Sequence, residues 1–276
     1  MDVLIFLTPP FLACSIILLL LGYLGIHVIK REIIFIDIAL AQIAAVGATA
    51  AHLLLGSEEG SMTAYLVSFG FTVVAAGFFS QIDKRITQIT HEAIIGVSYA
   101  IAAALALFIL AMAAGGDSHM EHMLTGSILW ATWGDILLCA ALFGGVGIFH
   151  VLFRRRFMYI SDNYTSLHKA EGKGPALWDF LFYASLGLVI TFSVKIAGVL
   201  VIFSFLIIPS VFSAFFASSW KKRIMIAWAI GLAAVICGLL FSYYLDFSTG
   251  PSVITFLGLF LVTGALTGMK RRTVPQ

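Results

Sequence analysis

The chain has 276 residues, of which 61% are hydrophobic and 11% charged, and its mean hydropathy is +1.05. This composition excludes a soluble domain and predicts a polytopic helical membrane protein, because long apolar runs replace the short alternating segments of an outer-membrane barrel. The net charge of +2 gives no indication of nucleic-acid binding, so we expect no nucleic-acid partner and a chain embedded in a lipid bilayer.

Nine apolar runs follow one another along the chain, at about residues 4–29, 33–55, 62–81, 93–114, 124–153, 177–194, 196–217, 224–245 and 252–269. Each is close to the ~20 residues that a helix needs to cross a bilayer. Only Lys195 divides the sixth run from the seventh, so one of these two could be re-entrant. We predict an all-α fold, with residues 1–276 forming a single transmembrane domain of about nine (eight to nine) membrane-spanning helices.

Lysine and arginine predict the orientation of these helices. If the loop with Lys30 and Arg31 is placed inside and the loops alternate, 15 of the 16 basic residues lie inside and only Lys195 lies outside. Such a bias predicts an N-terminus outside, a C-terminus inside and a multi-pass protein of the inner (cytoplasmic) membrane.

The second run carries the polar residues of greatest interest. Asp37 and Gln42 lie there among alanine and glycine residues, which allow close approach of a neighbouring helix. An ionisable side chain inside the bilayer usually faces a bundle interior or a watery path. The second run is thus predicted to line a translocation path. The alternative is that Asp37, five residues after Glu32, is solvated at the cytoplasmic interface.

A polar outer loop at 115–123 combines imidazole, thioether and carboxylate groups, which are possible ligands of a first-row transition metal. Its candidate ligands are Asp117, His119, Met120, Glu121, His122 and Met123. The loop is either a metal-capture site or a solvated loop that contains two histidines.

The longest inner loop, at about 154–176, has a helix start signal at Ser161 or Asp162 and a glycine stop at Gly172. These signals predict a short helix along the cytoplasmic face of the membrane. It is either a plain connector or a docking element for a cytoplasmic partner.

Motifs of catalysis are absent from the sequence. Gly172-Lys-Gly is not followed by the residues of a Walker A motif, and His91-Glu-Ala-Ile-Ile lacks the second histidine of HExxH. We expect no enzymatic activity, so any energy for transport comes from another chain or from an ion gradient.

The most specific stretch is Lys195-Ile-Ala-Gly-Val-Leu-Val-Ile-Phe-Ser-Phe-Leu-Ile-Ile-Pro-Ser-Val-Phe-Ser-Ala, in which Pro209 is expected to break or kink a helix and free a backbone carbonyl. It resembles the signature of the membrane permease subunits of the zinc/manganese ABC importer family. Segments 31–40, 92–96, 124–129 and 246–252 are similar to further blocks of that family, in the same order.

The resemblance implies the transmembrane permease subunit of an ATP-driven importer, with a divalent metal ion as cargo and no permanently bound cofactor. Its implied partners are a cytoplasmic ATP-binding subunit, an extracytoplasmic metal-binding protein and a second copy of the chain around a central path. The segment that docks on the ATPase corresponds to Asp162, Leu167, His168, Lys169, Ala170, Glu171 and Gly172. We expect the pivots of alternating access at Gly47, Gly198 and Pro209.

The second run departs from the family pattern. The family has an aspartate and a histidine four residues apart, and the matching positions are Ile38 and Gln42, with the carboxylate displaced to Asp37. Asp37 and Gln42 are about 140° apart on an ideal helix, and the missing imidazole favours a harder oxygen site. Another cargo, such as a metal chelate, is one alternative, and an ion-gradient carrier or sensor without an ATPase is another.

Overall fold

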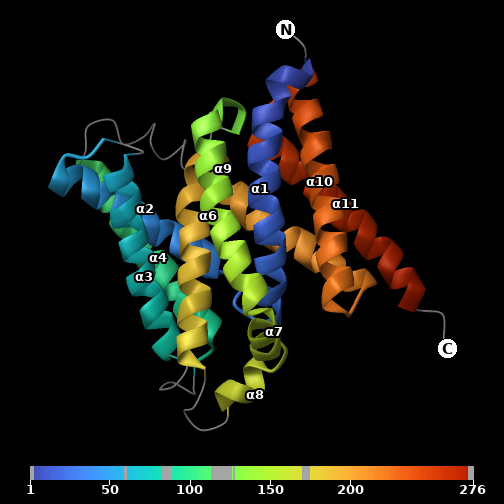
Figure 1. Ribbon diagram of the computed structural model, residues 1–276, viewed down its shortest axis with the longest axis horizontal. Helices are drawn as coiled ribbons and strands as arrows, with labels where there is room; N and C mark the ends of the chain where they lie inside the picture. Colours follow the sequence, from blue (N-terminus) through green and yellow to red (C-terminus); the bar gives the residue numbers. More distant parts are fainter. Residues whose placement is uncertain are drawn as a thin grey trace. The chain divides into compact units, whose positions relative to one another are not determined.

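The computed structural model describes residues 3–58, 61–82, 89–112, 126, 128–169 and 175–272, and within these ranges it contains helices and no strand (Figure 1). The helices, in chain order, are α1 (Val3–Lys30), α2 (Ile36–Leu55), α3 (Met62–Ile82), α4 (His91–Met112), the short 3₁₀ helix η1 (Ile128–Trp130), α6 (Trp133–Leu152), α7 (Arg154–Asp162), α8 (Tyr164–Lys169), α9 (Ala176–Phe216), α10 (Trp220–Leu245) and α11 (Thr249–Arg272).

Eight of the described helices are long and apolar enough to cross a membrane, which confirms the predicted all-α membrane fold. The sixth and seventh apolar runs form one 41-residue element, α9. At 1.5 Å per residue α9 would measure about 60 Å, twice the hydrocarbon thickness of a bilayer. Its one break is at Gly198, where φ is 76° and ψ 157°. The sequence-based division at Lys195 was therefore three residues too early.

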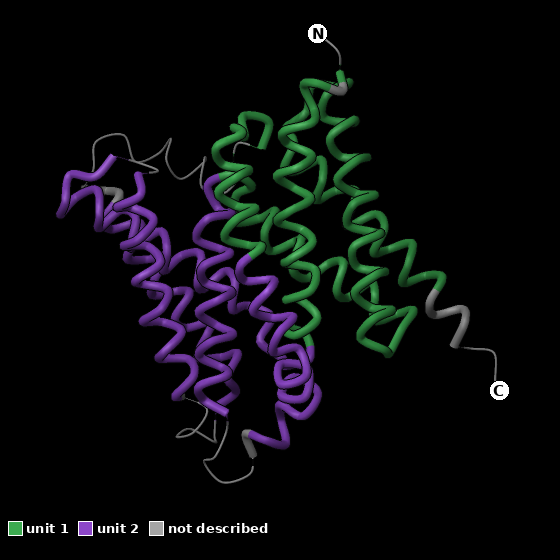
Figure 2. The backbone as a smooth tube through the Cα atoms, in the orientation of Figure 1, with its two compact units in different colours: residues 1–29, 124–144, 196–276 green, residues 30–123, 145–195 purple. Residues whose placement is uncertain are grey.

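The chain divides into two compact units, drawn in different colours in Figure 2. The first consists of residues 1–29, 124–144 and 196–276, and the second of residues 30–123 and 145–195. Since the boundaries fall inside α6 and α9, these helices contribute one part to each unit.

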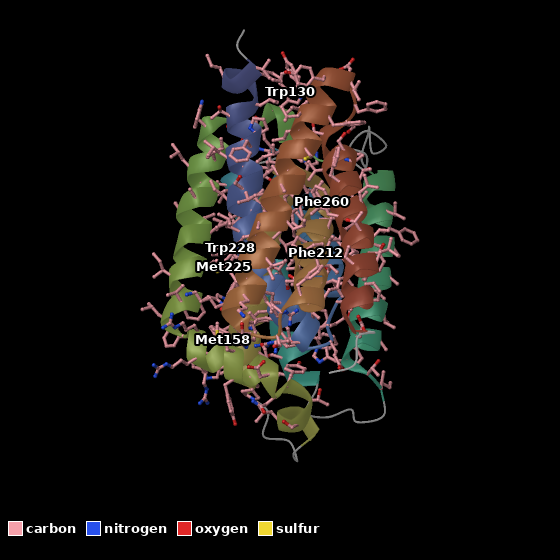
Figure 3. All side chains as sticks on the ribbon, turned by 90° about the vertical axis from the view of Figure 1, so that its right-hand side faces the viewer. Trp130, Met158, Phe212, Met225, Trp228 and Phe260 are labelled. Atoms are coloured by element: carbon pink, nitrogen blue, oxygen red, sulfur yellow. The ribbon has the colours of Figure 1, made fainter. Side chains whose placement is uncertain are left out.

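In the first unit α1 is packed against the second half of α9 and against α10. The Trp228 indole on α10 donates a hydrogen bond of 2.8 Å to the carbonyl of Leu19, and the Ser210 hydroxyl on α9 donates one of 3.1 Å to the carbonyl of Gly22. Figure 3 shows Trp228 and Met225 close together along α10. Each of these bonds satisfies a polar group that has no water to bind in the membrane interior.

In the second unit α2 packs against both α3 and α4. Its small residues permit this: a Cβ atom on Gly47 would lie 2.8 Å from the Cα atom of Ser68 on α3, closer than real Cβ atoms approach. On the α4 side, Val46 forms an apolar cluster with Ala102 and Ala106. The helix that carries Asp37 is thus held between two neighbours by direct backbone approach and apolar contact.

Candidate functional site

Asp37 lies in the first turn of α2 and is only 2% exposed. Among the described residues, no hydrogen-bond partner is found for its Oδ1 atom. The positive end of the helix dipole favours a carboxylate at this position, which offsets part of the cost of its burial. A side chain with this exposure is shielded from solvent in the single chain, but it lies at the end of the candidate span Ile36–Leu55, so its depth in the membrane stays a prediction.

Gln42 is half-buried, whereas Asp37 is buried, and the two side chains lie on different sides of α2. Ile38, Gln42 and Thr49 follow one half-buried stripe of the helix. Within the described ranges, no group of three or more His, Cys, Asp or Glu side chains that could hold a metal ion is found. The helix therefore offers one carboxylate and, on another stripe, one amide, instead of a complete coordination sphere.

The turn that leads into α2 is built around Arg31, which is 2% exposed. Its Nη1 atom donates a hydrogen bond of 2.9 Å to Oδ1 of Asp179 at the start of α9, and its Nε atom donates one of 2.9 Å to the hydroxyl of Ser161 on α7. The guanidinium also lies 4.0 Å above the ring of Phe182 and 5.4 Å from the ring centre of Tyr164. We call Arg31, Ser161, Tyr164, Asp179 and Phe182 the Arg31 cluster.

A second contact fixes the same turn from the side of α4. The backbone N–H of Ile34 donates a hydrogen bond of 3.2 Å to Oε1 of Glu92. Glu92 opens the block 92–96 that stood out in the sequence, and this bond gives the block a structural role. The start of α2 is thus held by α4 on one side and by the Arg31 cluster on the other.

Sequence reasoning missed the Arg31 cluster, because Arg31 was counted only as one of the basic residues that set the orientation. One signal was available in the sequence: Asp179 is an acidic residue inside an apolar run, and a charge in such a place needs a partner. No spacing rule could have found that partner, since Arg31 and Asp179 are 148 positions apart.

The segment predicted to be cytoplasmic differs from the prediction in where its helices begin. α7 begins at Arg154 and ends at Asp162, and α8 follows after Asn163. The prediction of an N-cap at Ser161 or Asp162 is wrong, because these side chains make tertiary contacts: Ser161 accepts from Arg31, and Asp162 forms an ion pair with Lys30. Both contacts tie α7 to the turn that leads into α2.

Of the seven predicted docking residues, Asp162 ends α7 and Leu167 is half-buried in α8. His168 and Lys169 complete α8. Ala170, Glu171 and Gly172 lie outside the described residues, as do all six candidate ligands of the outer loop, Asp117, His119, Met120, Glu121, His122 and Met123. The loop therefore stays a prediction.

The break in α9 coincides with Gly198, one of the three predicted pivots. Its φ and ψ are accessible almost only to glycine. Gly126, which also has a positive φ of 67°, packs directly on this break, since a Cβ there would lie 2.3 Å from the carbonyl carbon of Ala197. α9 continues through Pro209 with helical backbone angles, so the helix does not break there, and the expected kink and pivot at Pro209 stay predictions.

Comparisons with known proteins agree with this architecture. A family model described as the ABC 3 transport family matches residues 4–267. The high-affinity zinc uptake system membrane protein ZnuB of Haemophilus influenzae is 24% identical over 90% of this chain and 92% of its own length. The chelated iron transport system membrane protein YfeD of Yersinia pestis is 25% identical over 72% of this chain and 65% of its own. Further relatives are named manganese transport system membrane proteins.

A solved structure shares the fold. PsaBC from Streptococcus pneumoniae in complex with Fab superposes with a TM-score of 0.77 at 20% sequence identity, over 94% of this chain and 90% of that chain. At this identity the likeness concerns the fold alone.

Proposed function

Because the chain belongs to the ABC 3 transport family, we propose that it is the permease subunit of an importer that carries a divalent metal ion, zinc or manganese, past Asp37. It is a multi-pass inner-membrane protein and a transport subunit, with ATP hydrolysis in a separate chain. The observation that carries the proposal is a buried carboxylate in a membrane-spanning helix, with one oxygen that accepts no hydrogen bond from the described part of the chain. A cation is the partner that such an oxygen can bind.

The chemistry around Asp37 supports a transient site. A carboxylate and an amide are oxygen donors, which suit Mn²⁺ better than a soft metal, while zinc is favoured by the name of ZnuB. One carboxylate cannot fill a coordination sphere, so we propose that the remaining ligands are waters and groups from a second copy of the chain. A partly hydrated ion would bind weakly enough to leave again.

The coupling of ATP hydrolysis to Asp37 follows from the contacts of α7. In the proposed mechanism, closure of the ATPase pair pushes the segment 162–172, and α7 moves with it. Because Ser161 and Asp162 bind Arg31 and Lys30, the push reaches the turn six residues before Asp37. We propose that α2 then reorients, with Gly47, Gly198 and Pro209 as pivots.

The partners of this cycle are a cytoplasmic ATP-binding subunit, an extracytoplasmic metal-binding protein and a second copy of the chain. We keep the outer loop with His119 and His122 as the proposed place where the metal is captured from the binding protein. The metal is cargo in this scheme, and no permanently bound cofactor is needed.

The first experiment compares uptake by cells that express the complex with the parent chain or with Asp37→Ala. We expect loss of zinc and manganese uptake, while the amount of permease in the membrane and its co-purification with the ATPase stay unchanged. If the variant took up metal at the parental rate, Asp37 would not be part of the metal path, and the proposal would be contradicted.

A second cargo, a metal chelate, is favoured by one relative and one feature. YfeD is named for chelated iron, and the helix presents a single carboxylate where a bare ion needs several ligands. Stimulation of the ATPase in a reconstituted complex distinguishes a free metal ion from a metal chelate as the cargo. Free Zn²⁺ or Mn²⁺ should stimulate it under the favoured proposal, whereas stimulation by the chelate alone would replace the favoured cargo.

A further inference from the structure

The junction between α6 and α7 forms an open pocket of about 590 Å³, lined by the six consecutive residues Val151–Arg156. α6 ends at Leu152, Phe153 leaves the helical path, and α7 begins at Arg154. The whole pocket belongs to the second unit. It lies where α6, a candidate membrane-spanning helix, ends and α7 begins, so we expect it near the lipid headgroups.

The lining combines two kinds of side chain. Val151, Leu152 and Phe153 are 63%, 73% and 43% exposed, and they form the apolar part. The basic part consists of Arg154, Arg155 and Arg156, which are all exposed. Among the described residues, no acidic side chain lines the pocket. Three exposed apolar side chains followed along the chain by three exposed arginines match the boundary between acyl chains and phosphates.

These arginines differ from the neighbouring basic residues in their partners. Lys30 and Arg31 form ion pairs with Asp162 and Asp179. Within the described residues, no ion pair is found for Arg154, Arg155 or Arg156. Arg156 lies 5.7 Å from the ring centre of Trp178, which positions its guanidinium over an aromatic face. The charges of Arg154 and Arg155 are thus free to bind an anion from outside the chain.

Arg155 lies four residues before Tyr159 in α7, and therefore on the same side of the helix. Phe157 and Ile160 are buried against the protein, and the neighbouring Tyr159 is 57% exposed. Guanidinium groups bind phosphate oxygens in a bidentate manner, and basic side chains next to a membrane-spanning helix are attracted to anionic leaflets. Each such side chain raises the affinity by about fivefold.

We propose that the pocket at Val151–Arg156 binds an anionic phospholipid, with Arg154 and Arg155 on the phosphate and Val151, Leu152 and Phe153 against the acyl chain. The bound lipid attaches the start of α7 to the membrane, while Ser161, near the end of α7, attaches it to Arg31. This site is independent of the metal path, and its test needs no transport.

The test measures binding of phosphatidylglycerol and of phosphatidylcholine to the purified full-length chain, by native mass spectrometry from a neutral detergent. The variant Arg154→Gln/Arg155→Gln removes two charges from the pocket. Its matched control, Lys221→Gln/Lys222→Gln, removes two charges from another exposed basic pair at the start of α10. A third variant, Arg154→Lys/Arg155→Lys, keeps the charge and removes the bidentate geometry.

We expect the glutamine pair to weaken phosphatidylglycerol binding by about 25-fold, the lysine pair to weaken it less, and the control to change it by less than about threefold. Phosphatidylcholine binding should be weak in all variants, and glycerol phosphate, which has no acyl chain, should not compete. If the control lost as much affinity for phosphatidylglycerol as the glutamine pair, the effect would come from general surface charge, and the proposal would be overturned. The proposal would also be overturned if the glutamine pair left lipid binding unchanged and weakened binding of the ATPase subunit. That result would assign the pocket to the ATPase subunit.

Discussion

Two charged side chains that lie six residues apart, Arg31 and Asp37, are both only 2% exposed but differ in their partners. Arg31 donates to Asp179 and to Ser161 and lies over the Phe182 ring, so only its Nη2 atom is left without a hydrogen bond in the described structure. Asp37 has no counter-ion among the described residues, and its Oδ1 atom accepts no hydrogen bond there.

Under the proposed function, this difference separates a structural charge, Arg31, from a charge that takes part in transport, Asp37. A buried charge with a partner and hydrogen bonds holds segments together, and removal of one member of such a pair is costly. A buried carboxylate that has no counter-ion among the described residues, and one oxygen without a hydrogen bond there, is only partly compensated by the start of its helix, so we infer another reason for its presence. Variants at the two positions should therefore affect different quantities: the free energy of unfolding for Arg31, and transport for Asp37.

The largest effect on stability is expected from Arg31→Met. It removes the ion-pair partner of buried Asp179, and we expect a loss of about 3–5 kcal/mol in the free energy of unfolding. Chemical unfolding of the purified chain in detergent measures it. The control is Lys30→Met, because the pair of Lys30 with Asp162 is partly exposed and should contribute about 1 kcal/mol or less. Equal losses in the two variants would contradict the structural role of Arg31.

A smaller effect is expected from Ser161→Ala. The variant keeps the ion pair of Arg31 but removes the acceptor of its Nε atom, and a buried hydrogen bond to a charged group contributes about 1.5–3 kcal/mol. The same unfolding measurement applies. Ser166→Ala is the matched control, since that exposed hydroxyl donates only to the carbonyl of Asn163, in the same segment. A control as destabilised as Ser161→Ala would mean that α7 is not held through Arg31.

The smallest effect in this series is expected from Glu92→Gln. The amide oxygen of glutamine can still accept the 3.2 Å hydrogen bond from the N–H of Ile34, so only the negative charge is lost. We expect a change below about 1 kcal/mol in the free energy of unfolding. A loss as large as that of Arg31→Met would show that the charge of Glu92, and not the Arg31 cluster, fixes the start of α2.

The sequence predicted the fold class, the number of spans to within one and the family, because long apolar runs and local motifs carry that information. It placed the division of α9 at Lys195 and a break at Pro209, because a charge and a proline are visible in a sequence. The true break depends on the backbone angles of Gly198 and on the close approach of Gly126, from a distant part of the chain.

The candidate site was predicted less completely. Asp37 could be identified in the sequence as a carboxylate in an apolar run, but the sequence could not show that its side chain is buried. The contacts of Arg31 with Ser161 and Asp179 join segments more than 100 positions apart, and no local pattern encodes them. The same contacts explain why Ser161 and Asp162 look like a helix start and serve as tertiary contacts instead.

The central claim is tested most directly by making the same substitution at two aspartates with equal burial. Asp37 and Asp179 are both 2% exposed, and Asp→Asn keeps the shape of each side chain. Metal uptake per folded molecule and the free energy of unfolding are then measured for both variants. We expect that Asp179→Asn lowers the free energy of unfolding, and that Asp37→Asn leaves it within about 1 kcal/mol of the parent while metal uptake falls at least tenfold. An Asp37→Asn variant that loses stability and keeps its uptake per folded molecule would contradict the account.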